Sequence, residues 1–250
     1  MLPPPNINIP SLPQPDLFAT PSTTLHPDPS GALWYPAAST LIVADLHLEK
    51  GSSFAQRGIP LPPYDTRATL ACLAECLARL KPRRVVCLGD SFHDAEASGR
   101  IDEADAAVLA SLIDGRDWLW VSGNHDPLPP RGVGGRAVEG DLALGPLVLR
   151  HQAAPVPEIG AAGAREISGH FHPKASLRVH GRRVTGRCFV EDGTRLMLPA
   201  FGAYTGGLDV FDPAIRGHFP GGFSVHLIGR SRMLLLTDRQ LCPAATSAVR

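Results

Sequence analysis

The sequence lacks any apolar run close to the roughly 20 residues that a membrane-spanning helix needs, so we expect no membrane partner. It also lacks a secretory signal, because prolines interrupt its first residues where such a signal has basic residues and an apolar segment. We therefore expect a cytoplasmic location. An excess of charge is lacking as well: 24 Lys and Arg balance 24 Asp and Glu, so attraction of the whole molecule to nucleic acid is not evident.

Paired cysteines are also missing. The five cysteines are odd in number and include no Cys-x-x-Cys motif, which argues against a disulfide framework and against a zinc site built on thiolates. Cys72 and Cys76 lie four residues apart on an expected helix and are a candidate metal pair, but no further soft ligand is close in the sequence. We expect both to pack in the core.

Proline is concentrated at the N-terminus. Residues 1–30 hold nine of the 25 prolines and few large apolar side chains, which predicts a flexible tail. The chain has 250 residues, and we expect a single domain over 31–240. Residues 241–250 are expected to form a flexible C-terminal tail. The sequence does not indicate an oligomeric state.

The first half of the sequence alternates apolar runs with helical patterns. Strands are predicted over 40–48, 83–90 and 117–126, and helices over 67–80 and 103–113. Each predicted strand ends in polar residues. Open α/β sheets place their sites at the edge where the C-terminal ends of the strands lie. We therefore expect the functional residues at the polar ends of these strands.

The second half contains short apolar runs separated by Gly and Pro. This pattern is typical of β structure, and residues 177–190 predict a hairpin that turns at His180-Gly181. We therefore expect a largely β second half that packs against the α/β first half.

Five clusters of polar side chains follow the apolar runs. They are Asp45-Leu46-His47, Gly89-Asp90, Asn124-His125-Asp126, His151 and His170-Phe171-His172. Asp45 with His47, and His170 with His172, are i,i+2 pairs that an extended backbone points to one side. Oxygen and imidazole donors without thiolate suit Mn, Fe or Zn. Each cluster alone is common in loops and on surfaces, and only the set of five predicts a metal centre.

The order Asp-x-His, Gly-Asp, Gly-Asn-His-Asp, His and Gly-His-x-His resembles the calcineurin-like metallophosphoesterases over about residues 41–175. The longer stretches LIVADLHLEKG, LGDSFHD, VSGNHD, SGHFHP and LPAFGAYTGG resemble the bacterial ligase-associated DNA-damage-response endonucleases, up to about residue 236. The resemblance implies an α/β fold with four layers, an α/β/β/α sandwich in which helices flank two mixed β-sheets. It also implies two divalent metal ions, most often Mn, with Fe, Zn or Ni as alternatives.

The resemblance implies a role for each polar residue. One metal ion is assigned to Asp45, His47 and His172. The other is assigned to Asn124, His151 and His170. Asp90 is assigned to both ions, which is chemically reasonable because a carboxylate has two oxygens and a negative charge. A hydroxide between the ions is then the implied nucleophile.

His125 stands outside the implied ligand set, and we expect it to be the general acid that protonates the leaving alkoxide. Asp126 is expected to orient the His125 imidazole and to favour its charged form. The alternative is that His125 only supports the site. His93, Lys50 and Arg57 are candidates for substrate binding, although a surface position suits His93 equally well.

The predicted hairpin region is rich in cations. They are Lys174, Arg178, Arg182, Arg183 and Arg187. These side chains either bind a nucleic-acid backbone or form an ordinary solvated face. Phe201 and Tyr204 lie among glycines further on, and they either stack on a base or pack in the core.

Three functions follow from the sequence and its resemblance. The first is a metal-dependent phosphodiesterase or endonuclease that cleaves DNA in repair, with a ligase and a helicase as partners. The second keeps the chemistry but acts on a small molecule, as a phosphomonoesterase or nucleotide phosphodiesterase, and the zero net charge favours it. The third is an inactive metal-binding scaffold. The complete ligand set together with His125 argues against the scaffold.

Overall fold

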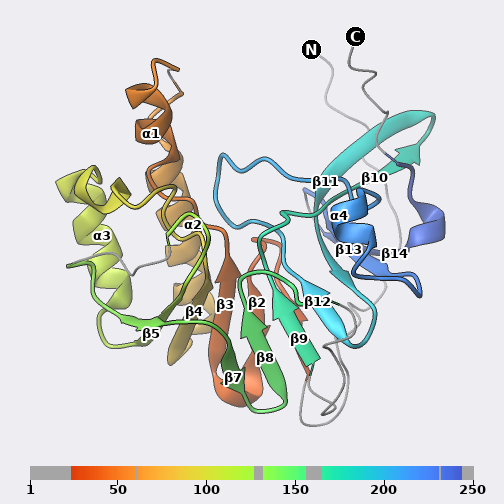
Figure 1. Ribbon diagram of the computed structural model, residues 1–250, viewed down its shortest axis with the longest axis horizontal. Coiled ribbons are helices and arrows are strands. Elements are labelled where there is room, and N and C mark those ends of the chain that lie inside the picture. Colours follow the sequence, from red (N-terminus) through yellow and green to blue (C-terminus); the bar gives the residue numbers. More distant parts are fainter. Residues whose placement is uncertain (1–23, 60, 127–131, 156–164, 231, 244–250) are drawn as a thin grey trace.

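A computed structural model describes residues 24–59, 61–126, 132–155, 165–230 and 232–243 (Figure 1). Two β-sheets pack on each other, and helices cover their outer faces. The predicted α/β/β/α sandwich with two mixed sheets is confirmed. Within the described residues, no helix has both the length and the apolarity to cross a membrane.

The first sheet has six strands in the order β1-β2-β3-β4-β5-β6. Their bounds are His26–Pro27, Leu33–Tyr35, Thr40–Ala44, Arg84–Leu88, Asp117–Val121 and Arg136–Val138. Strands β3 to β6 are parallel, whereas β1 and β2 pair antiparallel. The parallel strands therefore all end at one edge of the sheet.

The second sheet has eight strands, in the order β14-β13-β11-β12-β9-β8-β7 with β10 paired to β11. The strands of its first half are β7 Leu142–Leu144, β8 Leu147–Arg150, β9 Arg165–Ser168 and β10 Lys174–Val179. The others are β11 Arg182–Glu191, β12 Arg195–Met197, β13 Ser224–Ile228 and β14 Met233–Thr237. Strands β8 and β9 are parallel, so they too end at a common edge.

Helices cover the outer faces of the two sheets, except for the first helix, which packs against the second helix. The α-helices are α1 Lys50–Gln56, α2 Asp65–Leu80, α3 Glu103–Ile113 and α4 Pro213–Arg216. Short 3₁₀ turns lie at Pro36–Ala38, Ala97–Gly99 and Asp238–Gln240. Helices α2 and α3 pack on the first sheet, and α4 packs on the second.

Strand β3 shows why its sequence is apolar throughout. Ile42 and Ala44 face the second sheet in the core between the sheets, whereas Leu41 and Val43 face α2. A strand buried on both faces needs a continuous apolar run instead of an alternating one. Each large side chain buried in this way contributes about 1.5–3 kcal/mol of transfer free energy.

The predicted elements agree with the structure except at their ends. The helix predicted over 103–113 coincides with α3, and the hairpin turns at His180-Gly181 as predicted. Both turn residues have positive φ, 49° and 75°, as a two-residue type I′ turn requires. The strand predicted over 40–48 ends already at Ala44, because Asp45 adopts a φ of 55°. On α2, Cys76 is buried in the core between this helix and the first sheet, and Cys72 is partly buried against that core.

Residues 24–30, which we expected in a flexible tail, belong to the fold. Leu25 is fully buried between the sheets, and Asp28 forms a 2.8 Å ion pair with Arg79 of α2. At the other end, the Cys242 amide donates to the Ser176 carbonyl. Residues 1–23 and 244–250 lie outside the described residues.

Candidate metal centre

The predicted ligands all follow the C-terminal ends of strands. Asp45 follows β3, Asp90 follows β4, Asn124 follows β5, His151 follows β8, and His170 and His172 follow β9. These strands belong to both sheets, and the two sheets pack so that these ends lie together at one edge (Figure 1). The fold therefore gathers side chains from positions up to 127 residues apart.

The backbone at this edge is left-handed and not extended. Positive φ angles occur at five ligands, with values of 55° at Asp45, 45° at His47, 47° at Asp90, 72° at His170 and 49° at His172. Our expectation that an extended backbone points the i,i+2 pairs to one side is therefore wrong. Such conformations cost about 1–3 kcal/mol each and persist where the surroundings hold them. Here the His47 amide donates to the Asp90 carbonyl and the His170 amide donates to Asp45 Oδ2.

The first group of ligand atoms comprises Asp45, His47 and His172. The Nε2 atoms of the two histidines lie 3.3 Å apart, and His172 Nε2 lies 3.4 Å from Asp45 Oδ1. Asp45 Oδ1 is buried and has no hydrogen-bond partner among the described residues. Leaving a buried carboxylate oxygen unpaired is costly, and a cation at this point would satisfy it.

The second group comprises Asp90, His151 and His170. His151 Nε2 lies 3.1 Å from His170 Nδ1, 2.8 Å from Asn124 Oδ1 and 3.4 Å from Asp90 Oδ2. On the other side of the ring, His151 Nδ1 lies 3.0 Å from the Leu88 carbonyl, which can only accept. This contact places a proton on Nδ1 and aims Nε2 at the other donors, as is usual for a metal-ligating histidine.

The electrostatics of the second group also favour a cation. Burial lowers the pKa of His151, but the hydrogen bond to Asp90 and the charges of Asp45 and Asp90 outweigh it and raise the pKa to about 9. The two carboxylates thus hold a positive charge at this position even against burial. The residues present fit a divalent cation.

Asp90 connects the two groups. Its Oδ2 lies 3.4 Å from His151 Nε2 and 3.9 Å from His47 Nε2. Its Oδ1 accepts a 2.8 Å hydrogen bond from the His125 amide. Burial raises the pKa of Asp90, but the hydrogen bond and charge of His151 and the His125 amide hold it below its usual range. The carboxylate therefore stays charged between the groups.

His125 lies at the exposed side of the clusters. Its ring stacks on His93 with centroids 5.3 Å apart and meets the edge of His47 at 5.2 Å. Its Nδ1 lies 2.9 Å from the His93 carbonyl and so donates to it. Nε2 is then the nitrogen that can exchange a proton with a substrate.

Asp126 does not orient the His125 ring, and that expectation is wrong. Asp126 Oδ2 accepts from the amides of Ser91 and Phe92 at 2.8 and 3.1 Å. Its carboxylate, which is buried, holds the loop that follows Asp90, and burial raises its pKa to about 7. The orienting partner of His125 is instead the His93 carbonyl, a backbone group that sequence reasoning had no means to identify.

The three substrate-side candidates lie at different depths. His93 is buried, with its Nδ1 3.4 Å from His47 Nδ1, and so is not a surface histidine. Burial, followed by the charges of Lys50, His125 and Arg57, lowers the pKa of His93 to about 4. Lys50 starts α1 and is half-buried, whereas Arg57 follows this helix and is exposed. The structure thus brings Lys50 and His93 to the wall of the site.

Three glycines were missed as functional residues. They are Gly89, Gly123 and Gly169, and each directly precedes a ligand. A Cβ at these positions would lie 2.4 Å from His151, 2.1 Å from the Asp90 amide and 2.7 Å from Asp45, respectively. The sequence did carry a signal for them, since glycine stands before the ligand in each of the motifs Gly-Asp, Gly-Asn-His-Asp and Gly-His-x-His.

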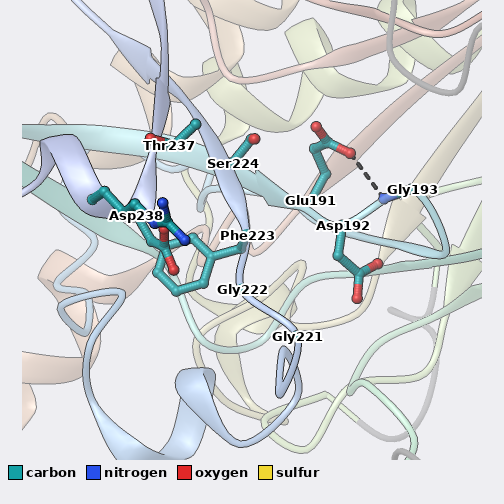
Figure 2. A pocket seen from close by; sticks show the side chains of 10 residues that line it. Glu191, Asp192, Gly193, Gly221, Gly222, Phe223, Ser224, Thr237 and Asp238 are labelled. Atoms are coloured by element: carbon teal, nitrogen blue, oxygen red, sulfur yellow. Dashed lines mark hydrogen bonds between the residues drawn. The ribbon is translucent and has the colours of Figure 1, made fainter.

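Other features lie away from the ligands. Phe201 is buried in the core over α2, so it packs there and does not stack on a base, whereas Tyr204 is exposed. A cavity of about 640 Å³ is lined by Glu191, Asp192, Asp238 and Arg239 among others (Figure 2). It holds none of the predicted site residues, and three carboxylates make it unsuited to a phosphate.

Comparison with known proteins agrees with this geometry. Residues 38–189 match the sequence model of the calcineurin-like phosphoesterases, and the chain belongs to this family. A nuclease from Pseudomonas putida, MPE, is similar in structure, with a TM-score of 0.64 and 27% sequence identity over 85% of this chain and 96% of that chain. YfcE, a phosphoesterase from E. coli, has a TM-score of 0.36 and 14% identity over 82% and 96% of the two chains. No curated protein matches significantly.

Membership of this family defines the class of protein. The chain has the fold of metal-dependent hydrolases that act on phosphoester bonds, and its His and Asp groups support the binding of divalent metal ions.

Proposed function

We propose that this protein is a binuclear metal-dependent phosphodiesterase that cleaves nucleic acid, with DNA as its substrate. The observation that carries the proposal is the pair of ligand groups joined by Asp90, whose Oδ2 lies within 3.9 Å of a histidine nitrogen in each group. A pair of metal ions can stabilise both the attacking and the leaving oxygen of an in-line displacement at phosphorus.

Each ligand keeps the role that the resemblance implies. Asp45, His47 and His172 would hold one ion, Asn124, His151 and His170 the other, and Asp90 both. Two such ions, when bound, polarise the phosphoryl oxygens and lower the pKa of a water near them. Oxygen and nitrogen donors without sulfur suit Mn, which we propose as the metal.

His125 supplies the proton for the leaving oxygen. Its Nδ1 is committed to the His93 carbonyl, so its Nε2 donates, and proton transfer of this kind contributes about 10²–10⁴ in rate. Lys50 at the wall of the site attracts the phosphate, and His93 positions the ring of His125 through its carbonyl.

The similarity to the MPE nuclease supports a nucleic-acid substrate. A role in repair beside a ligase and a helicase rests on the sequence resemblance alone. The second candidate, hydrolysis of a small phosphomonoester or nucleotide, is favoured by the zero net charge of the chain.

One experiment separates these functions. The Mn-loaded protein is incubated with circular single-stranded DNA, linear duplex DNA, an aryl phosphodiester and an aryl phosphomonoester. We expect cleavage of the circle and of the diester. Cleavage of the monoester alone would favour the second candidate, and absence of all cleavage with two ions bound would favour an inactive scaffold.

A further inference from the structure

Residues 174–187 of the β10–β11 hairpin carry charge of one sign. Residues 174–187 include five Lys and Arg and no Asp or Glu, in a chain whose total charge is zero. Arg178, Arg182 and Arg183 are exposed near the turn. A concentration of cations on one element of a neutral protein gives that element a local attraction to polyanions.

The register of the hairpin divides these cations between its two faces. Lys174 is opposite Arg187, and Arg178 is opposite Arg183. Side chains two residues apart and those directly opposite share a face, so these four cations form one face, the basic face. Arg182 is opposite Val179 and points to the other face.

Arg187 shows which way the basic face is turned. Its guanidinium donates to the carbonyls of Ala200 at 2.8 Å and of Ser30 at 3.3 Å, next to α2. Arg187 therefore fixes the base of the hairpin and is not available to a phosphate. Ala175, on the opposite face, is buried in the core under α4. The basic face thus looks towards the first sheet and its helices.

Lys174 joins the basic face to the metal centre. It follows His172 by two residues, and a Cβ on Gly207 would touch both the His172 carbonyl and the Lys174 side chain. Burial and the charge of Lys174 both lower the pKa of Lys50, whereas the carboxylate of Asp65 raises it. Cations from α1 and β10 therefore lie close enough to repel, and both elements rise above the edge where the ligands gather (Figure 1).

Arg183 donates to the Pro243 carbonyl and so, like Arg187, is held by the protein itself. We propose that the basic face of the hairpin, from Lys174 at the metal centre to Arg178 near the turn, binds the backbone of a nucleic-acid strand whose scissile phosphate lies at that centre. This inference rests on the proposed function. A six-residue strand such as β10 spans about 20 Å, the axial rise of about six nucleotides. Arginine and lysine bind phosphates without reading bases, so the contact is independent of sequence.

The test compares two charge reversals on the same hairpin. Arg178→Glu alters the basic face, and Arg182→Glu makes the same change in net charge on the other face. Binding is measured by fluorescence anisotropy with a labelled phosphorothioate 20-mer at several salt concentrations. Hydrolysis of a small aryl phosphodiester, which is too short to reach Arg178, is measured in parallel.

We expect Arg178→Glu to weaken binding of the strand at least tenfold. The salt dependence of the binding constant should become shallower by about one phosphate contact, whereas kcat/KM for the aryl diester should stay within twofold. Arg182→Glu should change binding less than twofold. The proposal would be overturned by equal effects of the two variants or by no effect of Arg178→Glu. Tighter binding of polyglutamate than of the strand would also overturn it. If the wild type cleaves the aryl diester but binds no strand, only the hairpin inference fails. If it binds the strand through Arg178 yet hydrolyses nothing, only the proposed function fails.

Discussion

His125 and Asp126 are adjacent in the chain but act on different parts of the site. The His125 ring lies against His47 and His93 at the exposed side, whereas the Asp126 carboxylate is buried against the loop after β4. The chain bends at Asn124 and His125, and the neighbouring side chains of His125 and Asp126 reach different parts of the site. The role of a residue at this edge therefore depends on where its backbone turns.

Replacement of His125 by alanine should separate proton transfer from metal binding. We expect His125→Ala to keep its metal content and to lose about 10²–10⁴ in kcat on diesters with poor leaving groups, since no group then protonates the leaving oxygen. Aryl diesters, which leave without a proton, should lose much less. Metal analysis and kinetics on both substrates check this, with His180→Ala in the exposed hairpin turn as the control. A loss of metal would show that His125 is a ligand.

Gly123 is expected to be intolerant of any side chain. A Cβ there would lie 2.1 Å from the Asp90 amide and 2.3 Å from Asp90 Oδ1, so the carboxylate between the two ligand groups must move. We expect Gly123→Ala to lower the free energy of unfolding by about 1–3 kcal/mol and to reduce the number of bound ions. Gly99→Ala, where a Cβ meets open space, is the matched control. Urea unfolding and metal analysis measure both effects.

At the scale of elements, helix α2 covers the first sheet through one face. Leu70, Leu73 and Leu77 are buried against β3 and its neighbours, and Glu75 and Arg79 face outwards. This face also supports the loops that leave β3 and β4. Packing behind the strands therefore contributes to the positions of the ligands in front of them.

Truncation of Leu73 should test this support. The side chain is fully buried, and we expect Leu73→Ala to lower the free energy of unfolding by about 2–5 kcal/mol through lost burial and the cavity that remains. Val108→Ala on α3, which removes an exposed side chain, should change it by less than about 0.5 kcal/mol. Denaturant unfolding measures both. A small effect of Leu73→Ala would mean that the core collapses around the vacated volume.

At the scale of the molecule, the second sheet buries a histidine far along the chain from the ligands. His226 on β13 is 3% exposed, and its Nε2 has no hydrogen-bond partner among the described residues. Burial lowers its pKa to about 4. Since the unfolded chain takes up the proton near pH 6.5, the neutral ring contributes stability above that pH, and the contribution is lost as the pH falls to about 4.

The acid sensitivity of the fold should therefore depend on this residue. Over this interval of about 2.5 pH units, His226 should lower the free energy of unfolding by at most about 3 kcal/mol. We expect His226→Phe to be less acid-sensitive than the wild type between pH 6.5 and pH 4, as measured by urea unfolding at each pH. The same substitution at exposed His180 is the control. Parallel profiles for wild type and His226→Phe would contradict the assignment.

The sequence by itself determined the α/β first half, the largely β second half and the polar clusters that are candidate ligands. Apolar runs such as that of β3 predict strands buried on both faces, because a polar side chain cannot be buried without a partner. The polar motifs after those runs predict where the ligands lie, because parallel strands end at a common edge. The helix over 103–113 and the turn at His180-Gly181 follow from local periodicity and turn chemistry.

Only the tertiary structure decided which polar groups meet. Asp126 accepts from the Ser91 amide, 35 positions earlier, and Arg187 donates to the Ser30 carbonyl, 157 positions earlier. His93 is buried against His47, although its loop sequence suits a surface position equally. Such pairings depend on how the two sheets and their loops pack, and no local pattern encodes the partner. Burial, which sets the strength of each contact, is likewise a property of the assembled fold.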